Sequence, residues 1–190
     1  MILVVDLNEH SLGYLEFVKP ILSVVRGAGL DYIVRKPGEV SEKDLASAGA
    51  AILSGTPLKD NSFLKEESIE RLAWLKTFKQ PVLGICAGME VIQVIFGGKL
   101  KDSKEIGMTK IRTTRKNKLF EGEFEAYCLH RKAVSNGLNQ NDGLKEFNIL
   151  AESDNCIEAI RHKKKEKEIY GVMFHPEVRN QDLIKRFLEF

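Results

Sequence analysis

A cysteine lies between two glycines in the segment Pro81–Glu90, in the pattern Gly84-x-Cys86-x-Gly88. The apolar residues before it predict a buried strand, and the helical spacing of apolar residues after it predicts a helix. The pattern is the thiol form of a strand–turn–helix nucleophile elbow, whose glycines permit a sharp turn that pushes the central side chain into the open. A helix N-terminus behind the sulfur favours the thiolate. The same pattern also fits a small cysteine packed beneath the turn.

A histidine and a carboxylate follow another apolar stretch far along the chain, in the sequence His175-Pro176-Glu177. A cysteine nucleophile needs a base, and the base needs a group that orients it. Residues two apart leave the same side of an extended segment, and proline keeps the residue before it out of the helical region. Taken alone, the two side chains fit a strand-end histidine and a surface acid. Taken with the elbow, they indicate a Cys-His-Glu triad.

The motifs GICAGME, at residues 84–90, and FHPEV, at residues 174–178, resemble those of the class I (triad) glutamine amidotransferases. Within that family the chain is most similar to the stand-alone amidotransferase subunits of two-subunit GMP synthetases. The similarity runs from Met1 to about Phe190, and shorter matches lie at residues 52–57, 96–98, 119–120, 130 and 169–172.

The resemblance implies an enzyme that hydrolyses glutamine. Cys86 is expected to attack the carboxamide, form a γ-glutamyl thioester and release ammonia. His175 is expected to take the thiol proton and later to protonate the leaving amine, while Glu177 orients His175.

The resemblance also assigns residues that bind the oxyanion and the substrate. Backbone N–H groups of the loop at Gly55 and Thr56, and of Ala87, are expected to stabilise the tetrahedral oxyanion. Glu90 and His130 are expected to contribute to the glutamine pocket. An ordinary turn glycine at Gly55 and a small space-filling residue at Ala87 are the alternatives.

Three positions depart from the family's pattern. Thr56 stands where a second glycine is usual, and a β-branched residue tolerates positive φ poorly. Glu90 replaces a glutamine, and its ionised carboxylate is expected to repel the α-carboxylate of the substrate. Leu129 and Lys132 replace a serine and an acid around His130. These departures concern substrate affinity and synthetase docking rather than the triad, with drift at tolerant positions as the alternative.

Length and composition indicate one soluble globular domain that spans residues 1–190, with 43% hydrophobic and 29% charged residues. A net charge of +2 and a mixed-sign run at residues 161–168 without aromatics argue against nucleic-acid binding. Three widely spaced cysteines argue against a disulfide framework and favour the cytoplasm. We find no clustered Cys/His metal motif, and no leader or apolar span that would place the chain in a membrane.

Strand and helix patterns alternate in the first half. Strands are predicted at residues 2–5, 32–34, 50–53 and 82–85, and helices at 12–26 with Ser11 as cap and Pro20 as a kink, from a Ser41/Asp44 capping box, and from 61 or 62 to about 78. These units predict an α/β fold of three layers, a mostly parallel sheet flanked by helices, as in the flavodoxin-like fold of the family. Sites in such sheets lie beyond the carboxyl ends of the strands, where residues 54–55 and 86 fall.

The second half is predicted to be β-rich and to add antiparallel strands. Extended segments are expected at residues 107–114, 123–129, 147–151, 157–160 and 169–174, with a final helix at 182–189. Residues 136–143 are predicted to be a polar loop, and residues 161–168 a solvated hairpin tip.

Three functions follow from these observations. The first is a glutaminase that supplies ammonia to an ATP-pyrophosphatase-type GMP synthetase subunit, which aminates XMP. No ATP-binding Gly-x-x-x-x-Gly-Lys-Ser/Thr signature occurs in the chain, so ATP and magnesium are expected on that partner and no cofactor on this chain. The second is a catalytically weak regulatory or binding subunit of the same fold. The third is a free-standing γ-glutamyl hydrolase.

Overall fold

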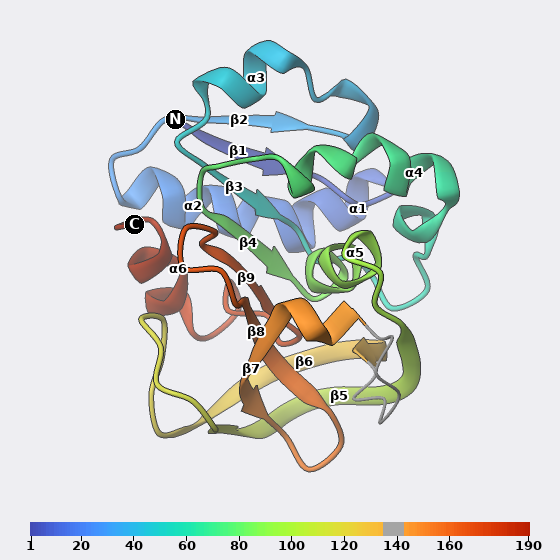
Figure 1. Ribbon diagram of the computed structural model, residues 1–190, viewed down its shortest axis with the longest axis vertical. Helices are drawn as coiled ribbons and strands as arrows, with labels where there is room; N and C mark the ends of the chain where they lie inside the picture. The colour runs from blue at the N-terminus through green and yellow to red at the C-terminus, as the bar shows by residue number, and fades with distance from the viewer. Residues whose placement is uncertain (135–142) are drawn as a thin grey trace.

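Nine strands form one continuous sheet in the computed structural model, which describes residues 1–134 and 143–190. The order across the sheet is β2-β1-β3-β4-β9-β8-β7-β5-β6 (Figure 1). The parallel strands are β1 (Ile2–Val5), β2 (Tyr32–Arg35), β3 (Ala50–Leu53), β4 (Val82–Ile85) and β9 (Ile169–Val172). The antiparallel strands are β5 (Leu100–Thr113), β6 (Glu123–Val134), β7 (Phe147–Glu152) and β8 (Ile157–His162). The predicted α/β fold with an antiparallel addition is confirmed.

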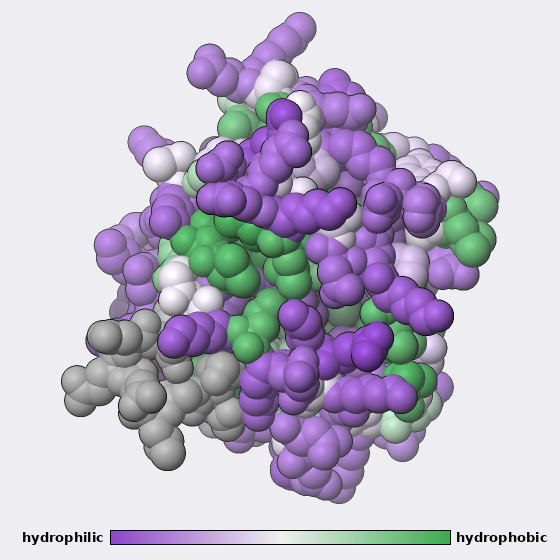
Figure 2. Space-filling view, turned by 90° about the vertical axis from the view of Figure 1, so that its right-hand side faces the viewer, coloured by the Kyte–Doolittle hydropathy of each residue, from purple (hydrophilic) through white to green (hydrophobic). Residues whose placement is uncertain are grey.

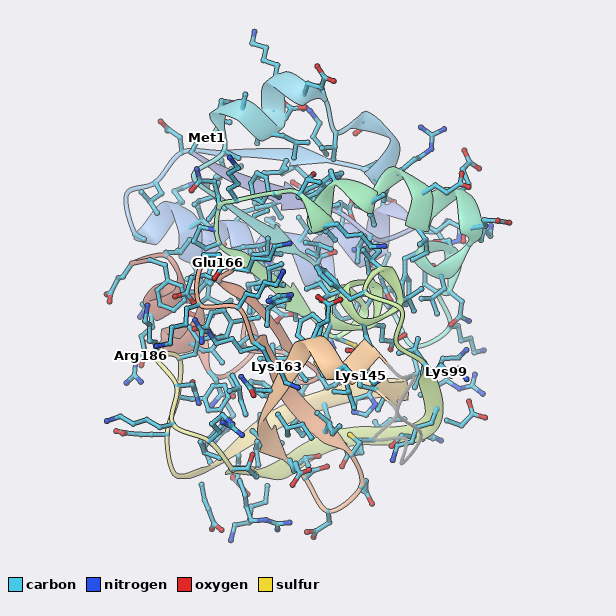
Figure 3. All side chains as sticks on the ribbon, in the orientation of Figure 1. Met1, Lys99, Lys145, Lys163, Glu166 and Arg186 are labelled. Carbon is cyan, nitrogen blue, oxygen red and sulfur yellow. The ribbon has the colours of Figure 1, made fainter. Side chains whose placement is uncertain are left out.

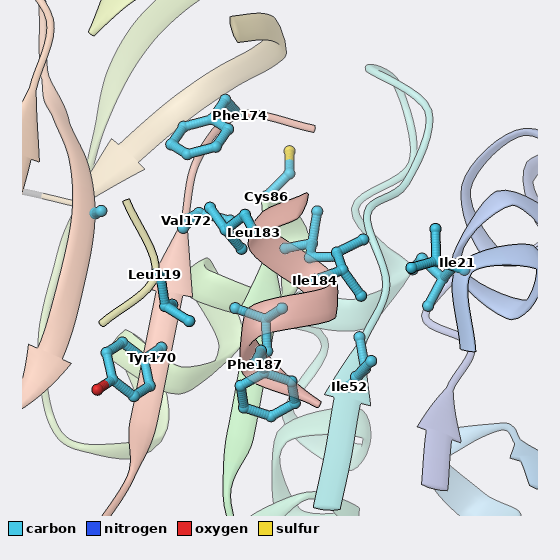
Figure 4. Close-up of a cluster of buried hydrophobic side chains, with 14 of the residues drawn as sticks. Ile21, Ile52, Cys86, Leu119, Tyr170, Val172, Phe174, Leu183, Ile184 and Phe187 are labelled. Carbon is cyan, nitrogen blue, oxygen red and sulfur yellow. The ribbon is translucent and has the colours of Figure 1, made fainter. Parts of the chain in front are cut away.

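Helices cover both faces of the parallel strands because side chains alternate between the two faces of each strand. On one face, Val4 and Ile52 belong to the same apolar cluster as residues of α2 (Lys19–Gly27) and α6 (Gln181–Phe187), part of which Figure 4 shows. On the other face, Leu3 and Leu53 belong to the cluster that contains α5 (Ala87–Ile95). The chain therefore has the three predicted layers, and the carboxyl ends of β3, β4 and β9 meet at one edge.

The helix after β1 differs from its prediction. Ser11 is not the cap: α1 (Ser11–Gly13) begins at this residue, and His10 precedes it without a capping side chain. A π-helical turn, η1 (Tyr14–Val18), then leads into α2. Pro20 follows that turn, and its missing N–H removes one hydrogen bond of a regular helix. The widened turn takes the place of the predicted kink.

The segment between β3 and β4 is not the single helix that was predicted. It forms three short helices, η3 (Ser62–Leu64), α4 (Glu66–Arg71) and η4 (Ala73–Lys76). Lys65 interrupts them with an extended backbone at ψ 143°. The earlier short helices are η2 (Pro37–Glu39) and α3 (Glu42–Ser47), and the Ser41/Asp44 capping box of α3 is confirmed.

The antiparallel half curls back toward the parallel half. β5 and β6 are longer than predicted, because the first part of β5 carries polar side chains that gave no strand pattern in the sequence. A β-bridge joins Cys128 of β6 to Phe174, just after β9, and the His175 N–H donates to the Tyr127 carbonyl at 2.8 Å. Strand β6 is thus held against the segment that carries the predicted catalytic histidine.

Two loop predictions fall in this half. Residues 163–168 connect β8 to β9 and carry the exposed Lys163 and Glu166, as predicted for a hairpin tip (Figure 3). The predicted polar loop at 136–143 lies outside the described residues, apart from Gly143, which begins η5 (Gly143–Glu146).

None of the helices in the described parts of the chain has both the length and the apolar character needed to cross a lipid bilayer. The face on the right-hand side of Figure 1 is mostly hydrophilic, with an apolar patch near its centre (Figure 2).

Candidate active site

Cys86 lies at a sharp turn between β4 and α5. Its φ of 49° and ψ of −103° make it the only non-glycine with positive φ among the described residues. A Cβ atom at Gly84 would lie 2.5 Å from the Gly88 carbonyl carbon, and one at Gly88 would lie 2.6 Å from the Leu53 carbonyl oxygen. Both glycines are therefore required for the close approach of α5 to the sheet, and the strained turn at Cys86 is the nucleophile elbow that the sequence predicts.

The Cys86 side chain is buried, contrary to the prediction that the elbow pushes it into the open. Only 3% of the residue is exposed, because β6 covers the turn and the Leu129 carbonyl lies 3.6 Å from the sulfur, as its hydrogen-bond acceptor. Figure 4 shows Cys86 beyond the end of its strand, near Phe174. Burial raises the pKa of the Cys86 thiol, and the positive charge of His175 acts in the opposite direction.

His175 and Glu177 form a buried pair beside Cys86. His175 Nδ1 lies 2.7 Å from Glu177 Oε1, and because a carboxylate accepts, Nδ1 carries the proton of this hydrogen bond. His175 Nε2 has no hydrogen-bond partner among the described residues. Burial alone would lower the pKa of His175, but the charges of Glu177 and Cys86 outweigh it and hold the pKa well above its usual value. The free nitrogen is thus a base poised to take a proton.

The His175 ring is fixed from several sides. The Phe17 and Tyr127 rings lie 5.2 and 6.3 Å from it, centroid to centroid. A Cβ atom at Gly55 would lie 2.5 Å from His175 Cε1, so a glycine is needed there for space rather than for a positive φ. The sequence singled out Gly55 but gave no signal for Phe17, since an aromatic residue at helical spacing indicates only a buried face.

The loop after β3 is held by a network that starts at the end of β1. Asn8 Nδ2 donates to the Gly55 carbonyl at 3.2 Å, and the Leu7 N–H donates to Ser54 Oγ at 3.1 Å. Thr56 is buried, and it is not among the residues with positive φ. The strain anticipated for a β-branched residue at this position is therefore absent.

A small cavity lies beside Cys86. Its volume is about 20 Å³, which is room for one or two water molecules. It is lined by Thr56–Leu58, Asp60, Asn61, Phe63, Cys86, Ala87, Glu90 and Leu129–Lys132. A surface cavity of about 520 Å³ shares three of these residues, Asn61, Arg131 and Lys132. A glutamine side chain needs more room than the small cavity offers, so its walls have to move apart when substrate enters.

Ala87 and Glu90 both face this cavity from the first turn of α5. Ala87 is the first residue of the helix, and its N–H therefore has no intrahelical acceptor. Glu90 is 5% exposed, and desolvation raises the pKa of its carboxyl to about 8, although the charge of Lys132 acts to lower it. At pH 7 the carboxyl is therefore mainly protonated and can donate a hydrogen bond, as an amide would. The charge repulsion expected from the sequence applies only above about pH 8.

The Glu90→Gln variant tests this protonation state. We expect similar Michaelis constants for glutamine in the variant and the parent at pH 6.5–7, because both side chains are then neutral donors. Near pH 9 the parent's constant should be higher by up to about ten-fold, the effect of 1–2 kcal/mol of repulsion. Steady-state kinetics of both proteins across this pH range measure it. A higher constant for the variant at pH 7 would instead indicate a carboxylate that binds the substrate ammonium.

The same variant has an expected effect on stability. Because the folded-state pKa of Glu90 is raised from its ordinary 4.5 to about 8, the folded chain binds more protons than the unfolded chain between these pH values. The free energy of unfolding of the parent therefore falls as pH rises across this interval, and a glutamine at this position would not contribute to that fall. Thermal unfolding at pH 5 and pH 8.5 should show the variant gaining stability relative to the parent at the higher pH. A constant difference between the two proteins would contradict the raised pKa.

His130 touches the cavity, but its ring points away from Cys86. Nδ1 lies 3.0 Å from the Ser103 carbonyl, and Nε2 lies 3.2 Å from Glu105 Oε2. A substrate contact through this ring stays a prediction. Its neighbour Lys132, which the sequence presented only as a departure from the family, lies close enough to affect the charge of Glu90 and lines the cavity.

Comparison with known proteins agrees with this geometry. Residues 14–189 match the family "Glutamine amidotransferase class-I". The glutamine-hydrolyzing subunit of GMP synthase from Methanococcus maripaludis strain S2 is 39% identical over 176 residues, which cover 90% of this chain and 80% of that protein. The protein of the same name from Methanocaldococcus jannaschii is 38% identical over 119 residues, 57% of this chain and 59% of that protein.

A solved structure has the same fold. The crystal structure of a candidate GMP synthase subunit from Thermoplasma acidophilum superposes with a TM-score of 0.83 at 23% identity, over 99% of this chain and 92% of that one. The match to the family spans almost the whole chain, and the chain belongs to the class I glutamine amidotransferases.

Proposed function

We propose that this chain hydrolyses glutamine through a Cys86-His175-Glu177 triad and delivers the ammonia to a synthetase subunit that makes GMP. The observation that carries the proposal is a cysteine on a strained elbow beside a histidine whose Nδ1 is held by Glu177 and whose Nε2 is unpartnered among the described residues. Nucleophile, base and orienting acid are the three groups that covalent amide hydrolysis requires.

The reaction proceeds in two halves. Cys86 Sγ bonds to the carboxamide carbon of glutamine while His175 Nε2 takes the thiol proton. The carbon–nitrogen bond then breaks, and His175 returns the proton to the leaving nitrogen, which departs as ammonia. Water attacks the resulting γ-glutamyl thioester with His175 again as base, and glutamate and the Cys86 thiol are regenerated.

Backbone N–H groups supply the charge stabilisation. The loop at Gly55 and Thr56 and the first residue of α5, Ala87, flank Cys86, and we assign them the oxyanion. Donors fixed by a helix start and by the Asn8 network need little reorganisation as the negative charge develops. Glu90 and Lys132 are placed to bind the amino-acid end of glutamine, because both line the cavity beside Cys86.

Two observations support a synthetase partner. Similar proteins that align with most of this chain carry the name of the glutamine-hydrolyzing GMP synthase subunit. In addition, the small cavity beside Cys86 does not hold glutamine as it stands, which fits an enzyme whose pocket opens when its partner is bound. ATP, magnesium and XMP are assigned to that partner, an ATP-pyrophosphatase-type subunit.

Reconstitution with a candidate synthetase subunit tests the proposal. We expect slow glutamine hydrolysis by the chain alone and at least about ten-fold stimulation by the synthetase with ATP, magnesium and XMP bound. Glutamine-dependent GMP formation should require both proteins, whereas ammonium chloride should support it without this chain. Glutaminase activity that is equal with and without each candidate synthetase would favour a free-standing hydrolase, and no glutaminase activity in either case would favour a binding subunit.

A further inference from the structure

Four side chains of metal-binding type meet inside the curled antiparallel half, outside the triad. They are Glu105 on β5, His130 on β6, Cys156 in the turn before β8 and Glu158 on β8. One ligand atom from each lies within 4.8 Å of the other three, and all four residues are buried. The group draws on three separate segments of the chain, so only the curl of the sheet brings it together.

The distances between the donor atoms suit a single small ion. His130 Nε2 lies 3.2 Å from Glu105 Oε2, and Cys156 Sγ lies 3.3 Å from both Glu105 Oε2 and Glu158 Oε1. A tetrahedral ion with bonds of 2.0–2.3 Å separates its ligands by roughly 3.3–3.8 Å. The group therefore needs only small side-chain adjustments to surround one ion.

His130 provides an independent sign that a ligand is missing from the group. A carbonyl oxygen only accepts, so the contact of Nδ1 with Ser103 O at 3.0 Å places the proton on Nδ1. Nε2 points into the group, and although Glu105 is near, the geometry is not that of a hydrogen bond; Nε2 has no such partner among the described residues. The residue is 2% exposed. A neutral imidazole fixed by a backbone carbonyl and presenting a buried lone pair is the usual form of a metal-binding histidine.

The carboxylates are also oriented by neighbours. Asn155 Nδ2 donates to Glu105 Oε1 at 2.8 Å, and Ser153 Oγ donates to Glu105 Oε2 at 3.3 Å. The hydrogen-bond partners of Glu105 and Glu158 in this group are neutral amide, hydroxyl and thiol groups. Two buried carboxylates without a compensating charge are costly, and a bound cation would offset that cost.

We propose that Glu105, His130, Cys156 and Glu158 bind one divalent transition-metal ion, for which Zn²⁺ fits best. One imidazole, one thiolate and two carboxylates form a mixed nitrogen, sulfur and oxygen set that is closed and four-coordinate, as in structural zinc sites. The ion would join the β5–β6 ribbon to β8. Because Leu129 to Lys132 on β6 line the cavity beside Cys86, the ion would also fix one wall of the substrate pocket.

The alternative is a metal-free network in which protonated His130 pairs with Glu105 and the carboxylates share a proton. Metal titration of the full chain in a Cys86→Ala background distinguishes the two, because this background removes the active-site thiol as a competing ligand. With Zn²⁺ we expect one equivalent bound, with a dissociation constant in roughly the nanomolar range or below, and release of protons. With Co²⁺ we expect a thiolate-to-metal absorption band.

Variants assign the ligands. Cys156→Ser should remove the Co²⁺ band and weaken Zn²⁺ binding more than about 100-fold, whereas Cys128→Ser, the matched control, should keep both. His130→Asn should weaken binding similarly, and His162→Asn, another buried histidine, should not. Zn²⁺ should raise the melting temperature of the parent but not of Cys156→Ser.

Two results would overturn the proposal. The first is no saturable Zn²⁺ binding and no Co²⁺ band in the Cys86→Ala protein itself, a result that does not depend on whether any further variant folds. The second is binding that Cys156→Ser and His130→Asn, shown to be folded by circular dichroism, leave unchanged. Because the readout is metal binding, its failure leaves the proposed glutaminase activity untouched.

Discussion

We expect the Cys86→Ala variant to lose glutamine hydrolysis almost completely, with kcat/KM reduced by at least about 10⁴-fold. No thioester forms without the sulfur, and no other side chain at the cavity wall can replace it as a nucleophile next to His175. The assay is glutamate release with the synthetase present, and a thermal unfolding curve close to the parent's would show that the elbow still folds.

Cys128→Ala is the matched control. Cys128 is also a buried cysteine, but it lies on β6, and burial together with the charge of Glu158 raises the pKa of its thiol, which makes it unreactive. Its replacement should leave turnover nearly unchanged. Substantial glutaminase activity in the Cys86→Ala variant would refute the proposed mechanism.

Gly55→Ala is expected to have the second largest effect. The added methyl would lie 2.5 Å from His175 Cε1 and 3.0 Å from Nδ1, so the ring has to move. The ring cannot move freely, because Glu177 holds Nδ1 and Phe17 packs against it. A shift of about 1 Å in a catalytic base costs on the order of 10²-fold in rate. We expect kcat to fall by at least that factor, with a smaller change in the Michaelis constant.

Gly27→Ala is a suitable control for the substitution itself. Gly27 ends α2, and nothing lies within 4 Å of a Cβ atom built there. It should leave kcat within about two-fold. A Gly55→Ala variant with parental kcat would mean that His175 can relocate without loss, which is incompatible with the tightly fixed base described above.

The local motifs were the most predictable part of the molecule. Gly84, Cys86 and Gly88 specify a turn that few other residues can form, because the packing distances leave no room for side chains at the two glycines. The strands of the parallel half were equally clear, since strands buried on both faces appear as continuous apolar runs.

Long-range packing was not predictable in the same way. The burial of Cys86 depends on β6, whose course depends in turn on the curl of the antiparallel half. The start of β5 is polar, so its strand character came from pairing rather than from its own sequence. Cys156 and His130 lie far apart in the sequence, and no spacing rule brought them together as a possible metal site.

Glu90 shows how burial changes the meaning of a residue. In the sequence it is a charged replacement for an amide, and repulsion of the substrate is the natural expectation. In the structure its environment raises the pKa to about 8, so near neutral pH the carboxyl has the neutral, hydrogen-bond-donating character of the residue it replaces. Desolvation by surrounding elements is a tertiary effect that the local sequence does not report.

The central claim is that Cys86 forms a covalent bond to the γ-carbonyl position of glutamine. Incubation with a glutamine-derived chloroketone or diazo ketone, with the synthetase present and followed by peptide mass spectrometry, tests it most directly. The account predicts one adduct per chain, confined to Cys86, slowed by excess glutamine and strongly reduced in His175→Asn. An adduct on Cys128 or Cys156 instead, or no adduct on Cys86 under these conditions, would contradict it.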